Sequence, residues 1–130
     1  MTDFETRLLP VHGDVVAPDG SEVRILLGLK GGGMAHFSLA PGQTSKAVTH
    51  RTIEEIWFFV SGRGQMWRKQ GARETVEDVE SGACVTIPLG VRFQFRSVGG
   101  EPLAAVAVTM PPWPGEDEAV VMEGIWEPTV

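Results

Sequence analysis

The chain has 130 residues, the length of a single domain, and 42% of them are hydrophobic, as in an ordinary globular protein. Its net charge of −6, with no basic stripe, argues against a nucleic-acid partner. No apolar run approaches the roughly 20 residues of a membrane span, and the N-terminus lacks the apolar stretch of a secretory signal. We therefore expect no membrane partner. The only cysteine, Cys84, is expected to be a small buried hydrophobe, and the location cytoplasmic.

Short apolar runs alternate with Gly, Pro and Asp along most of the chain, which is typical of an all-β sandwich or barrel. Helical periodicity over a useful length is absent. We treat residues 1–130 as one domain with a barrel core at about 23–110. The expected strands are Val23–Leu29, Met34–Ala40, Ala47–His50, Glu55–Val60, Gly64–Lys69, Thr75–Val79, Ala83–Pro88, Arg92–Ser97 and Leu103–Met110.

Two terminal segments lie outside this strand pattern. Residues 1–20 end in the turn sequence Pro-Asp-Gly. Residues 111–130 are rich in proline and contain five acidic residues and no basic one, a composition typical of a solvated surface. Disordered tails are normally poor in aromatic residues, whereas this arm contains Trp113 and Trp126. We therefore expect the arm to pack on the barrel wall or on a partner subunit.

One stretch runs from Gly42 to Gly62, contains His50 and Glu55, and reads GQTSKAVTHRTIEEIWFFVSG. A second stretch, GACVTIPLGVRFQFRS, begins at Gly82 and places Pro88 and Gly90 at fixed intervals.

The two patterns together resemble the two motifs of the cupin superfamily, G-x5-H-x-H-x4-E-x6-G and G-x5-P-x-G-x2-H-x3-N. The resemblance covers about residues 23–110 and identifies the chain as similar to small single-domain cupins. It implies a double-stranded β-helix, a jelly-roll barrel, here with N- and C-terminal arms. Because cupins include many enzymes and also pure binding domains, the fold by itself does not select a reaction. Single-domain cupins commonly form dimers, so a homodimer is expected.

The resemblance also implies a metal site, and this chain departs from it. His50 matches the second His of the first motif and Glu55 its carboxylate, ligands that would suit Fe, Mn, Ni or Zn. Val48 and Phe93 occupy the positions of two other His ligands and have no lone pair to offer. Two protein ligands are too few for a tight site, so we expect no tightly bound metal. One alternative is that His36, on the strand before, points into the pocket and supplies a third ligand.

Adjacent residues of a strand point to opposite faces, so only one of Glu54 and Glu55 can enter the barrel. Both faces of EIWFFV are apolar, so alternation does not decide between them, and the motif spacing selects Glu55. Trp57 would then face inward beside it. With Phe93, Phe95 and Trp67 as further candidates, and Val48, the wall would form a mostly apolar pocket with a few polar groups, typical of a small-molecule site.

These observations favour a barrel that binds a small, partly apolar or aromatic molecule. A buried Glu55 would have a raised pKa and could act as a general acid or base with His50 as its partner, without metal. The opposing interpretation is a His–Glu pair that only joins two strands. The alternative function is a metal-dependent enzyme, dioxygenase-, isomerase- or cyclase-like, that uses His50, Glu55 and perhaps His36. A third is an interaction module in which the barrel is a scaffold for a dimer.

Overall fold

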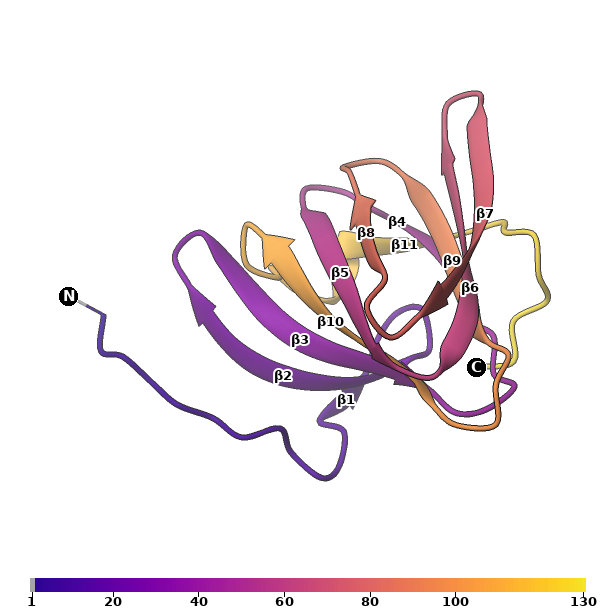
Figure 1. Cartoon of the computed structure of the whole chain (residues 1–130). Helices are drawn as coiled ribbons and strands as arrows, with labels where there is room; N and C mark the ends of the chain where they lie inside the picture. Colours follow the sequence, from indigo (N-terminus) through magenta and orange to yellow (C-terminus); the bar gives the residue numbers. More distant parts are fainter. Residues whose placement is uncertain (1) are drawn as a thin grey trace.

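The computed structural model describes residues 2–130 and consists almost entirely of antiparallel strands in two facing sheets (Figure 1). The first sheet has the order β1-β2-β3-β10-β5-β8. Its strands are β1 (Val15–Val16), β2 (Glu22–Leu29), β3 (Gly32–Leu39), β10 (Leu103–Met110), β5 (Glu54–Ser61) and β8 (Cys84–Ile87). The second sheet has the order β11-β4-β9-β6-β7. Its strands are β11 (Ala119–Met122), β4 (Ala47–His50), β9 (Arg92–Ser97), β6 (Arg63–Gln70) and β7 (Arg73–Glu80).

The nine expected strands are all present, with ends that differ by at most two residues. Two further strands, β1 and β11, come from the terminal segments. A short 3-10 helix, η1 (Glu116–Glu118), precedes β11. The expectation of an all-β jelly-roll barrel is therefore confirmed. Within residues 2–130, no helix is long and apolar enough to cross a membrane.

One turn of the barrel requires a glycine. Gly62, between β5 and β6, has a φ of 77°, in the region that favours glycine. A Cβ at this position would also collide with the carbonyl group of Pro102. The turn that carries the chain from β5 in the first sheet to β6 in the second therefore depends on a residue without a side chain.

The core fills the space between the two sheets. Its largest fully buried members come from both sheets and are Trp57, Phe59, Phe93, Phe95, Leu39, Ile53, Met66, Ile87 and Leu103. In β5 the exposure alternates strictly, so that Glu55, Trp57 and Phe59 point into the barrel while Ile56 and Phe58 point outward. The inner side of β5 thereby becomes part of the core. Near the start of the strand, at Glu55 and Trp57, it also lines a small internal cavity.

The C-terminal arm packs against its own barrel. β11 pairs with β4, with Ala119 opposite His50. Farther along, the Gln94 side chain accepts hydrogen bonds from the backbone N–H groups of Ile125 (3.0 Å) and Trp126 (3.1 Å). The Arg96 guanidinium lies 4.2 Å from the ring centroid of Trp126. Of the two expected sites for this arm, the structure thus uses the barrel wall.

Candidate functional site

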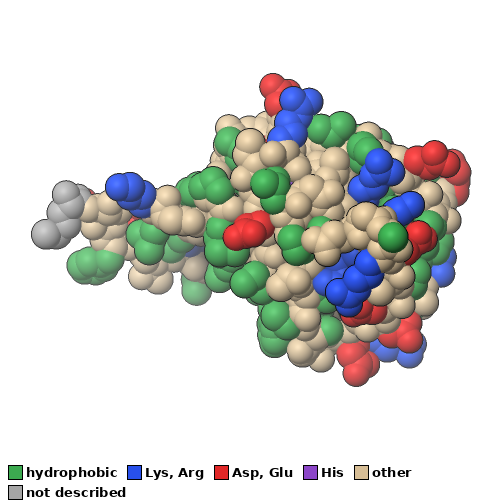
Figure 2. Space-filling model, turned by 90° about the horizontal axis from the view of Figure 1, so that it is seen from above, with side chains coloured by type: hydrophobic (Ala, Val, Ile, Leu, Met, Phe, Trp, Pro, Cys, Tyr) green, Lys and Arg blue, Asp and Glu red, His purple; other side chains and the backbone are tan. Residues whose placement is uncertain are grey.

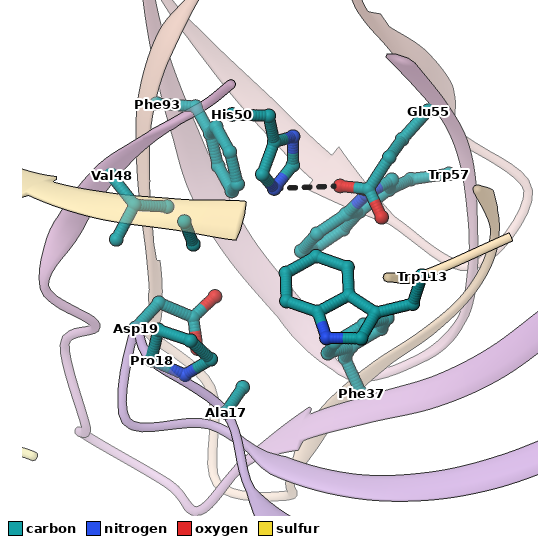
Figure 3. A pocket seen from close by; sticks show the side chains of 11 residues that line it. Ala17, Pro18, Asp19, Phe37, Val48, His50, Glu55, Trp57, Phe93 and Trp113 are labelled. Carbon is teal, nitrogen blue, oxygen red and sulfur yellow. Dashed lines mark hydrogen bonds and ion pairs between the residues drawn. The ribbon is translucent and has the colours of Figure 1, made fainter. Parts of the chain in front are cut away.

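The site lies at the end of the barrel where β4 stops and β5 starts. His50 is the last residue of β4, and Glu55 is the second residue of β5. Val48 of β4 pairs directly with Phe93 of β9, so the two hydrocarbon side chains that replace motif histidines are neighbours. All four residues line one cavity (Figure 3).

His50 and Glu55 are in contact and almost completely buried. The distance from His50 Nε2 to Glu55 Oε1 is 3.4 Å, and the two side chains are 3% and 1% exposed. The Trp57 Nε1–H group donates a hydrogen bond of 3.3 Å to the same Glu55 oxygen. Two buried atoms, Glu55 Oε2 and His50 Nδ1, have no hydrogen-bond partner within the described chain. Such atoms are rare in native proteins and suggest a bound water or ligand.

Burial shifts the pKa values of both groups toward their neutral forms. Removal from water raises the pKa of Glu55 from 4.5 to about 8, against the smaller effect of the Trp57 hydrogen bond. Removal from water also lowers the pKa of His50 from 6.5 to about 4. The contact at neutral pH is therefore between a carboxylic acid and a neutral imidazole, although its distance would also suit an ion pair.

Aromatic rings surround this polar pair. Trp57 stacks on Phe37, with ring centroids 5.2 Å apart and planes inclined by 8°. Phe93 and Phe95 meet Trp57 edge to face at 5.7 Å and 5.0 Å. Such pairs stabilise a core beyond the area they bury. The inner wall is therefore fixed by packing, and its apolar surroundings cause the pKa shifts.

Trp113 closes the cavity from the side of the C-terminal arm. Its ring stands edge-on to His50, with centroids 5.7 Å apart, and 38% of the residue is exposed. Figure 3 shows the indole among Glu55, Trp57 and Phe37 at one side of the cavity. The enclosed space is about 20 Å³, and a water molecule needs about 10–15 Å³ on such a measure. In this closed form the cavity has room for about one water.

Glu118 holds the loop that joins His50 to Glu55. Its carboxylate accepts hydrogen bonds from the backbone N–H groups of Thr52 (2.7 Å) and Ile53 (3.2 Å), and from the Thr52 hydroxyl. Burial alone would raise the pKa of Glu118, but these hydrogen bonds outweigh it and lower the pKa. One acidic residue of the arm is thus buried and structural, contrary to the prediction of a wholly solvated acidic surface.

Two predicted site residues lie on the side of their sheets that faces away from the cavity. His36 pairs with Val106, which in turn pairs with the exposed Phe58, so all three share the outer face of the sheet. The condition for a ligand role, an inward-pointing even face of β3, is not met, because Phe37 faces the cavity instead. Trp67 pairs with Gln94 under the C-terminal arm, on the face opposite to the core residue Met66. Neither His36 nor Trp67 lines the cavity.

The prediction for Cys84 was wrong. The thiol-bearing residue is exposed, because Cys84 is the first residue of the edge strand β8 and lies opposite Phe58, on the outer face. The apolar neighbours in the sequence suggested burial, but they alternate between the two faces.

Sequence reasoning did not find three parts of the site: Trp113, Glu118 and Asp19. Asp19 lies across the cavity from Glu55 (Figure 3). Its carboxylate accepts hydrogen bonds from the Ser21 N–H (2.9 Å) and hydroxyl (2.6 Å), and burial raises its pKa despite them. The Pro-Asp-Gly turn signal was visible in the sequence, but its place beside the barrel mouth depends on tertiary structure.

The donor set does not fit a tightly held transition metal. His50 and Glu55 supply two ligands, and within residues 2–130 no group of three His, Cys, Asp or Glu side chains is placed to hold an ion. Catalytic zinc and the iron facial triad both need three protein ligands. The side chains in the other two motif positions, Val48 and Phe93, can only pack.

A second, larger hollow lies between the β6–β7 hairpin and β8 and has a volume of about 330 Å³. Arg68 bridges its two sides, donating to the Thr86 carbonyl (2.7 Å) and to Glu77 (2.8 Å). Neither His50 nor Glu55 lines this hollow. Its basic and polar lining therefore forms a separate feature of the sheet edges.

Comparison with known proteins agrees with this architecture. The family model for the cupin domain matches residues 35–109, more than half of the chain, and the chain therefore belongs to the cupin family. No curated protein matches the sequence.

Solved structures show the same fold at low sequence identity. An uncharacterised conserved protein with a double-stranded β-helix domain from Klebsiella pneumoniae has a TM-score of 0.70 and 19% identity, covering 92% of this chain and all of that one. A recombinant oxalate oxidase in complex with glycolate has a TM-score of 0.72 and 22% identity, covering 90% of this chain and 62% of that one. An oxalate decarboxylase from Bacillus subtilis has a TM-score of 0.69 and 17% identity, and this chain spans 29% of its length.

Proposed function

We propose that this cupin binds a small, uncharged, partly aromatic molecule in the barrel beneath Trp113. The observation that carries the proposal is the pair of buried atoms without a hydrogen-bond partner, Glu55 Oε2 and His50 Nδ1, on residues of a mostly apolar wall. Buried polar atoms without partners are costly, and a ligand hydrogen bond would offset that cost. A concave, mostly apolar site with a few polar groups is the usual form of a small-molecule site.

Binding requires the site to open, because ligand pockets usually have about 300–1,000 Å³ and the closed cavity has about 20 Å³. Trp113 is the side chain suited to move. It is 38% exposed, and it lies between β10 and η1 among Pro111, Pro112 and Pro114, which have no backbone N–H to donate. A ligand that replaced the indole would meet Trp57 on one side and His50 on the other. We therefore expect a flat molecule of about the size of one or two rings.

The chemistry of the wall favours an uncharged ligand. No Lys or Arg lines the cavity, and Glu55 and His50 are both neutral near pH 7. Oxalate, which the names of two structural relatives mention, would meet no cation here and would lie near Asp19. A ligand with one hydrogen-bonding group beside an aromatic ring suits the site better.

The same pair could transfer a proton without metal. Protonated Glu55 is a potential acid, and neutral His50, 3.4 Å away, is a potential acceptor. A catalytic acid is most effective when its pKa is near the working pH, and a pKa of about 8 meets that condition. An isomerase- or cyclase-like proton transfer on the bound molecule would therefore be compatible with the site.

The test uses ligand binding and metal content together. We expect neutral aromatic compounds, indole among them, to raise the melting temperature of the wild type, and of Trp113→Ala more strongly, because this variant removes the side chain that covers the cavity and leaves room for an aromatic ring. Glu55→Leu should remove the response of the wild type to compounds that carry a hydrogen-bonding group. Trp126→Phe is the matched control, because Trp126 packs on Arg96 away from the cavity. This variant should respond like the wild type.

Two outcomes would contradict the proposal. One is a folded wild type and Trp113→Ala variant that respond to no compound of a broad neutral aromatic set. The other is about one transition ion per chain in wild-type protein purified without a tag or chelator, lost in His50→Ala. That second result would favour the metal-dependent alternative and would mean that a non-protein ligand completes the coordination of His50 and Glu55.

A further inference from the structure

The hollow between the β6–β7 hairpin and β8 is much larger than the cavity beside Glu55. Its volume is about 330 Å³, whereas the cavity has about 20 Å³. Figure 1 shows the tip of the hairpin standing beyond the neighbouring strands. Ligand pockets usually have about 300–1,000 Å³, so this hollow has room for a small organic molecule while the cavity stays closed. We call it the hairpin hollow, and its polar lining consists of Arg68, Gln70, Arg73, Thr75 and Thr86.

The inner side of the hairpin changes from apolar to polar toward its tip. Met66 of β6 belongs to the core. Arg68, two residues farther along, lies opposite Thr75 of β7, and Gln70 lies opposite Arg73. Because alternate residues of a strand share a face, these four polar residues are on the same side of the sheet as Met66. The core packing thus ends at Met66, and beyond it the inner side of the sheet is lined by groups that can bind a polar ligand.

Arg68 is held at both sides of the hairpin hollow and still has a donor to offer. Its Nη1 donates a hydrogen bond to the Thr86 carbonyl (2.7 Å), and its Nη2 donates one to Glu77 (2.8 Å). Its Nε–H group is buried and has no hydrogen-bond partner within residues 2–130. A buried donor without an acceptor is costly, and an oxygen atom of a ligand beside Arg68 would offset that cost.

The charge of the hairpin hollow favours an anion. Glu77 balances Arg68, whereas Arg73 forms no ion pair within the described part of the chain. No Asp or Glu of residues 2–130 lines the hollow. Figure 2 views the molecule from this end and shows Lys and Arg side chains grouped, with some acidic ones, on the half away from the extended N-terminal segment. The hollow therefore has one positive charge in excess, although the whole chain has a net charge of −6.

We infer that the hairpin hollow binds a small organic oxyanion whose carboxylate or phosphate group contacts Arg73 and Arg68. Guanidinium groups match the geometry of both kinds of oxyanion. Gln70 and Thr75 can bind hydroxyl groups of the same ligand, and Pro88 and Val91 supply a short apolar wall. A hydroxylated carboxylic acid or a sugar phosphate has this combination of groups. A nucleic acid would need a longer row of basic residues along its phosphates.

The hairpin hollow and the Glu55 cavity select opposite ligands although they are neighbours. Phe93 lines the cavity and lies opposite Arg68, which lines the hollow, so one cross-strand pair separates the two spaces. The cavity contains no Lys or Arg in its wall, and the hollow contains two arginines. Binding of an oxyanion can therefore be tested independently of binding beneath Trp113.

The test follows backbone amide signals of the full chain by nuclear magnetic resonance. The probes are glycerol phosphate, malate and, as the uncharged control, glycerol, all at constant ionic strength. We expect saturable shifts at the amides of Gln70, Arg73, Thr75 and Thr86 with at least one of the two anions and none with glycerol. The anion that binds more tightly identifies the acidic group for which the hollow is built.

A pair of arginine variants makes the test specific. Arg73→Gln should raise the Kd of the bound anion at least about tenfold, because a hydrogen bond between charged groups is lost. Arg63→Gln is the matched control: Arg63 is an exposed residue at the opposite end of the same strand, and its loss changes the net charge equally. This control should keep the Kd of the wild type. Glu55→Leu should also keep it, because Glu55 does not line the hollow.

Three results would overturn the inference. The first is a folded wild type in which neither anion gives saturable shifts. The second is an equal Kd in Arg73→Gln and Arg63→Gln, which would mean that the anion responds only to net charge. The third is binding that is lost in Glu55→Leu and kept in Arg73→Gln, which would assign the anion to the cavity instead.

Discussion

The two faces of β5 have nearly the same hydrophobicity and opposite surroundings. Glu55, Trp57 and Phe59 are at most 3% exposed, whereas Ile56, Phe58 and Val60 are about half as exposed as in an extended chain, at 43%, 46% and 39%. The inner side chains are enclosed by the second sheet, and the outer ones by nothing within the described subunit. Composition therefore indicates that the strand is hydrophobic on both sides, and tertiary structure determines which side forms the core.

The two faces of β5 also differ in the groups that they offer to a ligand. The inner face carries a polar group, Glu55, that burial holds in its neutral form, so it can interact with an uncharged ligand. The outer face has no carboxyl group next to Phe58, whose cross-strand neighbours are Val106 and Cys84, and it presents only apolar surface there. The inner face suits a small molecule, and the outer face suits a protein surface.

The largest effect separates Trp57 from its neighbour Phe58. Trp57→Ala should lower the free energy of unfolding by about 3–5 kcal/mol, because it opens a cavity among packed rings. Phe58→Ala should cost about 1 kcal/mol or less in a subunit kept monomeric by dilution. Chemical denaturation followed by circular dichroism would measure both. Equal losses for the two variants would contradict the assignment of the inner and outer faces.

A smaller effect is expected from the residue that directs the chain into β5. Glu118→Ala should lower the free energy of unfolding by about 1–3 kcal/mol, because it leaves the buried N–H group of Ile53 and the half-buried N–H group of Thr52 without this acceptor. The neighbouring Glu116→Ala, on an exposed residue of the same helix, is the control and should change stability little. A Glu118→Ala protein as stable as this control would show that the loop keeps its shape without the clamp.

The pH dependence of stability should distinguish Glu55 from Glu54. The folded pKa values of Glu55 and His50, about 8 and about 4, compare with 4.5 and 6.5 when they are exposed. Between about pH 4.5 and 6.5 folded and unfolded chains hold equal numbers of protons at these two groups, so their contribution is flat. From pH 6.5 to 8 the folded protein holds one more proton than the unfolded chain, so the free energy of unfolding should fall by about 2 kcal/mol as the pH rises.

Below pH 4.5 the unfolded chain holds the extra proton, so stability should fall again as the pH drops. Urea denaturation across this range, on metal-free protein, would measure the profile. Glu55→Gln should remove the decline above pH 6.5, whereas Glu54→Gln, on the exposed outer side, should retain it. A decline that persists unchanged in Glu55→Gln would assign the proton to another group.

The sequence predicted much of the frame because turns and strand lengths are local properties. The four motif glycines, Gly42, Gly62, Gly82 and Gly90, all have φ values between 77° and 97°, a region that other residues rarely adopt. Such positions are recognisable without any knowledge of contacts. The inward position of Glu55 followed from motif spacing, not from hydrophobic alternation.

The parts that were missed depend on segments distant in the sequence. His36 fits the chemistry of a ligand, but the register with Val106 turns it outward. Trp113 and Glu118 belong to an arm whose composition suggested a surface segment, yet they close the cavity and hold the loop that precedes Glu55. No local pattern contains the pairing of β11 with β4 that brings them there.

The sequence by itself determined the class of barrel, the positions of its turns and the loss of two metal-binding histidines, because each of these is a matter of residue identity at fixed spacing. Only the tertiary structure decided that the cavity is closed by Trp113, that His50 and Glu55 face each other as neutral groups, and that one apolar side of β5 is left exposed. Burial and pKa depend on what surrounds a side chain, and those neighbours come from strands and arms far along the chain.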